Sequence, residues 1–211
     1  MELNYVDTGI ELGYSLFVIV LCLIVYVKTK EIYDLSHHKG IKYFRLAFLF
    51  FSIAYLFRFV SLLFLIASEG DMHLLFFGYI PFSIASSFAI IFLTYSTIWK
   101  KIDWSTAREI GLFCLIVLCI SLFVFFTRSP QIFLISQIVL FLIAIPMTYL
   151  APHKKAHFSK LRVVYILLFL FWILNISLLG PSHSFYARYI LYSVSAFLFG
   201  FIVYKVLNTI K

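Results

Sequence analysis

Charged residues are scarce in this sequence. Asp, Glu, Lys and Arg make up 12% of its 211 residues, whereas 64% are apolar and 20% are aromatic. A soluble domain carries about 25% charged and about 45–50% apolar residues. A chain this apolar cannot bury its surface in a water-soluble core, so the sequence excludes a soluble domain and predicts a membrane protein.

Patterns that carry catalysis or metal binding are also lacking. The three cysteines fall inside apolar runs, so we expect no disulfide framework. The sequence has no Ser–His–acid arrangement, no pair of intramembrane aspartates and no glycine-rich phosphate loop. His153 and His157 lie four positions apart, but adjacent lysines crowd them with positive charge, which disfavours a metal ion. The sequence therefore predicts neither an enzyme nor a bound metal or cofactor.

What the sequence does have is seven apolar runs long enough to cross a bilayer. About 20 apolar residues span the ~30 Å hydrocarbon layer, and a segment in lipid must be helical to satisfy its backbone. The predicted spans are about 9–27, 44–67, 74–98, 110–127, 131–150, 162–180 and 185–206. We therefore expect residues 1–211 to form a single all-α, seven-helix transmembrane domain in the cell membrane.

Lysine and arginine residues gather in alternate loops, which predicts the orientation. Of the 17, 14 follow spans 1, 3, 5 and 7, two lie on the opposite side, and one, Arg58, lies inside span 2. This pattern predicts an outside N-terminus and a cytoplasmic C-terminus. Because the charges sit at helix ends, we expect the net charge of +8 to face anionic lipids of the inner leaflet and not nucleic acid.

Spans 3 and 7 open on similar sequences, which favours an internal repeat. A Tyr-Ile pair begins at Tyr79 near the start of span 3 and at Tyr189 near the start of span 7. In each span a serine lies four positions after the tyrosine, and the two patterns are 110 positions apart in the sequence. Two parallel copies of three spans joined by span 4 resemble the 3+1+3 plan of the SWEET sugar transporters. The resemblance covers the plan alone, because the Pro-Gln pair typical of the wider PQ-loop relatives occurs once, at Pro130, and span 1 has none.

Arg58 is a charge inside a predicted span. It lies roughly eight residues below the outer end of span 2, or ~12 Å at 1.5 Å per residue. Exposure of the charge to lipid at the bilayer centre would cost about 3 kcal/mol or more. Arg58 should therefore face the bundle, where Glu11, Gln137 and Asn175 are candidate partners at a similar depth.

Two interpretations of Arg58 remain open. In one, it forms a structural ion pair with Glu11 or extends toward the membrane surface. In the other, its guanidinium binds a small polar or anionic ligand in a pocket in the outer half of the membrane. The predicted ligand-binding residues are Arg58, Tyr55, Asn175, Gln137, Glu11 and Tyr192, of which Tyr192 could equally be an interfacial anchor.

Small residues recur at helical spacing in spans 3 and 7. In lipid, helices approach one another closely at such residues, so we predict packing faces there, with a hydroxyl-lined pathway as the alternative. The predicted packing residues are Ser83, Ser87, Ser193, Ala196 and Gly200.

These features favour a small solute transporter. The same topology would serve a seven-helix sensor that signals to a cytoplasmic partner, or an accessory subunit of a larger membrane complex. The sequence does not identify the ligand.

Overall fold

The computed structural model describes residues 5–68, 72–98, 115, 117–123, 126–127, 135–140, 142, 158–178 and 185–210. Every described residue is α-helical except 37, 38 and 68. The described part of the chain is therefore all-α, as its composition predicts.

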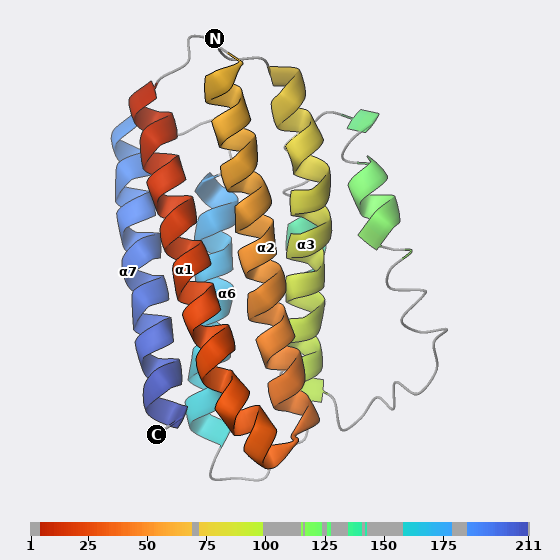
Figure 1. Ribbon diagram of the computed structural model, residues 1–211, viewed down its shortest axis with the longest axis vertical. Helices are drawn as coiled ribbons and strands as arrows, with labels where there is room; N and C mark the ends of the chain where they lie inside the picture. Colours follow the sequence, from red (N-terminus) through yellow and green to blue (C-terminus); the bar gives the residue numbers. More distant parts are fainter. Residues whose placement is uncertain are drawn as a thin grey trace.

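The helices run alternately up and down in one bundle (Figure 1). They are α1 (Tyr5–Ser36), α2 (Lys39–Ala67), α3 (Met72–Ile98), α6 (Phe158–Leu178) and α7 (Phe185–Ile210). α2 packs between α1 and α3, and α7 packs against α1 and α6. α1 and α7 both begin at the end of the bundle marked N in Figure 1, which we call the N-terminal end, so they lie parallel. Helical pieces at 117–123 and 135–140 fall within predicted spans 4 and 5.

The helices extend past the apolar runs that predicted them. α1 continues to Ser36, well beyond the predicted end at 27. Lys28, Lys30 and Glu31 are good helix formers, so the helix can continue where the chain leaves the hydrocarbon layer. α1 ends at Ser36, and the next residue, His37, has a left-handed φ of 47° and donates its N–H to the Tyr33 carbonyl, as in a helix C-cap.

Four helical stretches within the described residues are long and apolar enough to cross a membrane. They are Val6–Ser36, Lys39–Ala67, Ile80–Thr97 and Tyr186–Asn208, and α6 adds a shorter apolar stretch, Ile166–Asn175. These stretches indicate a multi-pass membrane protein. Spans 4 and 5 lie mostly outside the described residues, so the count of seven and the parallel repeat stay predictions.

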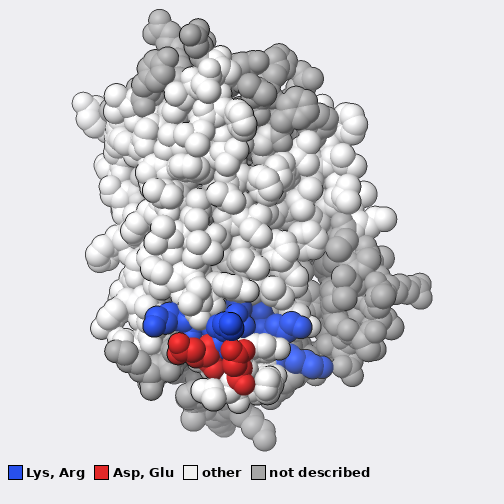
Figure 2. Space-filling view, viewed as in Figure 1, with Lys and Arg blue, Asp and Glu red and all other residues white. Residues whose placement is uncertain are grey.

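In Figure 2 the charged side chains of the described residues gather at one end. Lysine, arginine, aspartate and glutamate side chains form a band there, at the end where α1 leads into α2, and the described surface above the band shows no charged side chain in this view. We call this the basic end. Large apolar side chains such as Leu63 and Phe197 are exposed along the helices, as lipid contact requires.

Aromatic rings join α2, α6 and α7 in the core. Phe171 stacks on Phe199 with ring centroids 4.3 Å apart, and Phe51 meets Trp172 edge-on at 4.8 Å. Such pairs contribute about 0.5–1.5 kcal/mol each beyond the area they bury. The core therefore fixes how α6 and α7 face α2.

The small residues of α3 and α7 differ in burial. Ser83 and Ser87 on α3 are fully buried. On α7, Ala196 is partly buried, but Ser193 is exposed and a Cβ at Gly200 would meet nothing within 4 Å. Ser193 and Gly200 thus do not form the predicted packing face. Ser195, two positions from Ser193, is fully buried in its place.

A membrane-impermeant maleimide tests the predicted orientation. In a chain lacking its natural cysteines, we expect Ser68→Cys, at the N-terminal end of the bundle, to react in intact cells. Ser36→Cys, at the basic end, should react only after the membrane is permeabilised, because the distribution of lysine and arginine predicts that the basic end faces the cytoplasm. The reverse pattern would contradict the orientation.

Gly78 is a close contact between α3 and α2, and substituting it tests that packing. A Cβ there would lie 2.6 Å from Ser61 Cβ and closer still to its Oγ. We expect Gly78→Ala to lower stability by about 1–3 kcal/mol through overpacking, measured by thermal unfolding in one detergent. Adding Ser61→Gly should restore most of the loss.

Gly13→Ala is the matched control, because a Cβ at Gly13 meets nothing within 4 Å. It should leave stability unchanged or slightly raised. Equal effects of Gly78→Ala and Gly13→Ala would show that α2 and α3 do not meet at Gly78.

Candidate functional site

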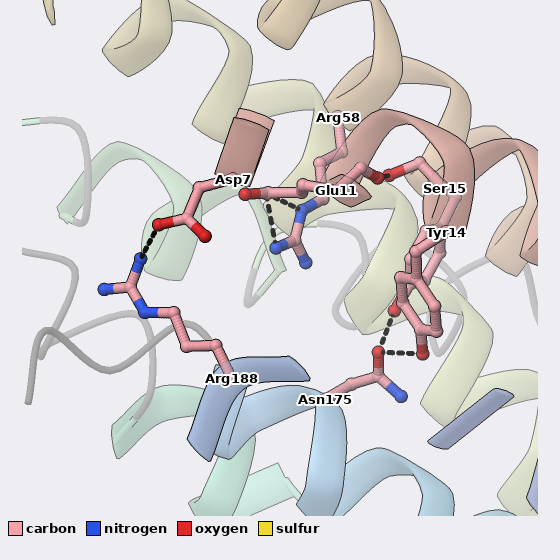
Figure 3. Close-up of polar contacts among 8 residues, drawn as sticks. Asp7, Glu11, Tyr14, Ser15, Arg58, Asn175 and Arg188 are labelled. Atoms are coloured by element: carbon pink, nitrogen blue, oxygen red, sulfur yellow. Dashed lines mark hydrogen bonds and ion pairs between the residues drawn. The ribbon is translucent and has the colours of Figure 1, made fainter. Parts of the chain in front are cut away.

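Polar side chains from four helices gather toward the N-terminal end of the bundle (Figure 3). α1, α2, α6 and α7 all contribute, although each is otherwise largely apolar. We call this set the polar cluster; its members are Asp7, Glu11, Tyr14, Tyr55, Arg58, Asn175, Arg188, Tyr192 and Ser195. Its geometry decides what the site can bind.

α1 and α7 contribute to the cluster with matching spacing. Asp7, Glu11 and Tyr14 lie at i, i+4 and i+7 on α1, which places them on one face. The same separation of 181 positions relates Tyr14 to its partner Ser195 and Asp7 to its partner Arg188. Because the two helices are parallel, one register brings all these side chains together.

Arg58 and Glu11 form an ion pair between α2 and α1. Arg58 Nε and Nη2 both donate to Glu11 Oε1, at 2.8 and 2.6 Å. The Arg58 side chain is 9% exposed and the Glu11 side chain 25% exposed, so the carboxylate is the outer member. The Arg58 guanidinium also lies 6.0 Å from the ring centres of Tyr55 and Phe82.

One guanidinium nitrogen of Arg58 forms no hydrogen bond with a described residue. Its Nη1 is buried and has no hydrogen-bond partner among the described residues. A buried donor without a partner is unfavourable by about 1–3 kcal/mol, and by more when the group is charged. Arg58 therefore has hydrogen-bonding capacity that Glu11 does not use.

A second, looser ion pair lies beside the first. Arg188 Nη1 is 3.9 Å from Asp7 Oδ2, and Arg188 Nε is buried without a partner among the described residues. Figure 3 shows the Asp7 and Glu11 carboxylates on neighbouring turns of α1, facing Arg188 and Arg58 respectively. The cluster holds two arginines and two acids, so its formal charge is zero.

Asn175 is the centre of a closed hydrogen-bond network. Its Oδ1 accepts from the hydroxyls of Tyr14, at 2.7 Å, and of Tyr55. Its Nδ2 donates to the Phe171 carbonyl at 2.8 Å and to Ser195 Oγ at 3.1 Å. An amide has two donors and two acceptor positions, so Asn175 is fully satisfied by α1, α2, α6 and α7.

The predicted pocket therefore separates into two parts. Tyr55 and Asn175 are occupied in a network that ties four helices together, so a ligand would not find them free. Arg58 and Glu11 form the ion pair that one of the two interpretations predicts. Arg58 Nη1 has no hydrogen-bond partner among the described residues. Their role in ligand binding stays a prediction.

Gln137 and Tyr192 have different surroundings from those predicted. Gln137 donates from Nε2 to Ser87 Oγ on α3 at 3.1 Å, and its Oε1 is buried with no partner among the described residues. Gln137 therefore forms its hydrogen bond with α3 and is not a partner of Arg58. Tyr192 is buried, with its ring centre 5.0 Å from that of Tyr14, so it packs inside the bundle.

Four members of the cluster are not among the ligand-binding residues predicted from the sequence. They are Asp7, Tyr14, Arg188 and Ser195. The signal was present, because Asp7 and Tyr14 share a face with Glu11, and Ser195 shares one with Tyr192. Without the α1–α7 register, these faces could not be matched.

One relative of the chain is known from Archaeoglobus fulgidus. That protein is uncharacterised and is 30% identical to this chain, in an alignment covering 94% of this chain and 91% of the relative. No protein-family model matches the chain, and no solved structure matches it.

Removing the Asn175 amide tests the network. We expect Asn175→Leu to destabilise the protein by about 1–3 kcal/mol, because it leaves buried hydroxyls with fewer partners. Tyr55→Phe removes one hydrogen bond and should cost about 0.6 kcal/mol, and at most about 1.7 kcal/mol, the range found in membrane proteins. Thermal unfolding in one detergent measures both.

Tyr204→Phe is the control, because Tyr204 is exposed on α7. It should not change the unfolding temperature. An Asn175→Leu protein as stable as the unmodified one would show that the network does not hold these helices together.

Proposed function

This chain belongs to the same family as that uncharacterised archaeal protein, and we propose that it binds a small anionic solute at Arg58, as the first step in moving that solute across the membrane. The relative is uncharacterised and therefore indicates no ligand. The proposal is therefore supported by the chemistry of the polar cluster.

The observation that carries the proposal is the unused Nη1 of Arg58. It is a buried, charged donor with no partner among the residues that the structure describes. A guanidinium presents its N–H groups in a planar fork that matches the oxygens of a carboxylate or a phosphate. An anion that contacts Nη1 would satisfy the donor that Glu11 leaves unpaired.

The surroundings of Arg58 favour a strong contact. The rings of Tyr55 and Phe82 flank the guanidinium, and little of the side chain is exposed. Charges attract more strongly where the local dielectric constant is low. Glu11 is more exposed than Arg58, so in this proposal the anion approaches Arg58 past Glu11.

Transport is the use of this site that we favour. An intramembrane charge that faces the inside of a bundle is typical of a substrate or ion pathway. The predicted 3+1+3 plan, with its resemblance to a transporter architecture, supports the same function. A sensor would bind the same anion without moving it.

Anion binding tests the proposal in protein reconstituted into lipid nanodiscs. Propionate and inorganic phosphate are suitable probes, added while the thermal stability is measured. We expect at least one of them to stabilise the unmodified protein. The double variant Glu11→Gln with Arg58→Gln should fold, because it removes both charges of the pair, and should lose the stabilisation.

Arg45→Gln is the matched control. It makes the same change on α2 at the basic end, where Arg45 lies over the rings of Tyr26 and Tyr33. Anion binding should survive it. Binding that survives the double variant, or no binding at all, would refute the proposed site.

Proteoliposomes separate transport from sensing. Radiolabelled anion should accumulate inside vesicles that contain the unmodified protein and not inside those with the double variant. Binding without uptake would favour the sensor.

A further inference from the structure

Glu11 holds Arg58 by only one of its two carboxylate oxygens. Both contacts from Arg58 end on Oε1, and Oε2 accepts no hydrogen bond from a described residue. A carboxylate matched to a guanidinium uses both oxygens in a fork. Glu11 thus leaves hydrogen-bonding positions of the Arg58 guanidinium open, and a second carboxylate can bind there beside Glu11 or in its place.

The charge of the cluster limits what can enter. The charged groups are Arg58 on α2, Arg188 on α7, and Asp7 and Glu11 on α1, and they balance. The groups facing them from the packed helices are uncharged in their ordinary forms: Tyr14, Tyr55, Asn175, Tyr189 and Tyr192. An entering anion adds one uncompensated negative charge in a site largely removed from water, where excess charge is strongly unfavourable.

One proton restores the balance, and Glu11 is placed to take it. The entering anion and Glu11 would both face the single guanidinium of Arg58, and a neighbouring like charge favours the protonated form of an acid. Asp7 faces Arg188 instead (Figure 3). Glu11 is also partly exposed, so a proton can reach it from water at the N-terminal end.

The structure assigns to Arg58 and Glu11 a site that takes one small monocarboxylate together with one proton, which resides on Glu11. This inference rests on the proposed anion site and names its substrate class. A monocarboxylate brings the group that Glu11 already offers to Arg58, and its single charge is balanced by one proton. A dianion would leave the cluster with a net negative charge. When the monocarboxylate leaves, Glu11 releases the proton and restores the ion pair.

Titration calorimetry with propionate measures the proton directly. Binding heats in two buffers of different ionisation enthalpy give the number of protons taken up. We expect close to one per propionate in the unmodified protein. Affinity should fall about tenfold per pH unit over the range in which a full proton is taken up, because each binding event then requires one proton.

Two variants assign the proton. Glu11→Gln should bind propionate with no proton uptake and with an affinity that no longer depends on pH. Asp7→Asn combined with Arg188→Gln removes the neighbouring ion pair and leaves the remaining charges balanced, so it should keep the uptake of one proton.

Several outcomes would overturn the inference while leaving the anion site in place. These are propionate binding without proton uptake, a pH dependence that persists in Glu11→Gln, loss of proton uptake in the Asp7→Asn, Arg188→Gln double variant, and binding of phosphate but not of propionate. If neither anion binds the unmodified protein or Glu11→Gln, the proposed function itself fails. Should Glu11→Gln not fold, the proton counts of the unmodified protein and of the Asp7→Asn, Arg188→Gln double variant still decide the question.

Discussion

The need to neutralise Arg58 inside an apolar bundle organises this structure. A guanidinium cannot face lipid without a large penalty, so α1 must present Glu11 to α2. Once Glu11 is placed, helical geometry puts Asp7 and Tyr14 on the same face of α1. That face then meets α7, where Arg188 and Ser195 lie at the matching positions. One buried charge thereby sets the rotation of α1 relative to two neighbours.

The polar cluster has one part in which the hydrogen-bonding groups are satisfied and one part in which they are not. Around Asn175, every hydrogen-bonding group of the amide has a partner, and the network joins α1, α2, α6 and α7. Around Arg58, one carboxylate oxygen receives two donors while Nη1 has no partner among the described residues. A satisfied network is suited to holding helices, whereas an unsatisfied buried cation is suited to receiving a ligand.

Hydropathy predicted the helices well because a backbone in lipid must satisfy its hydrogen bonds internally, as an α-helix does. The apolar runs located α1, α2, α3, α6 and α7, and the charge of Arg58 correctly named Glu11 among its candidate partners. Rotation about the helix axis was harder to predict, because nearly every position of these helices is apolar. On α7 the predicted face passed through Ser193, whereas Ser195 is buried, a difference of about 200° around the axis. Asn175 and Gln137 were expected as partners of Arg58. Asn175 instead bonds Tyr14 and Tyr55 within the same cluster, and Gln137 bonds Ser87.

In our proposal, Arg58 keeps a place for an anion that Glu11 does not fill. Solid-state NMR in lipid tests it most directly, by measuring dipolar couplings between ¹⁵N-labelled arginine side chains and carboxyl-¹³C propionate. We expect a close contact between propionate and the Arg58 guanidinium, which disappears in the double variant with Glu11→Gln and Arg58→Gln. A guanidinium in contact with the Glu11 carboxyl alone, at propionate concentrations that saturate binding, would contradict it.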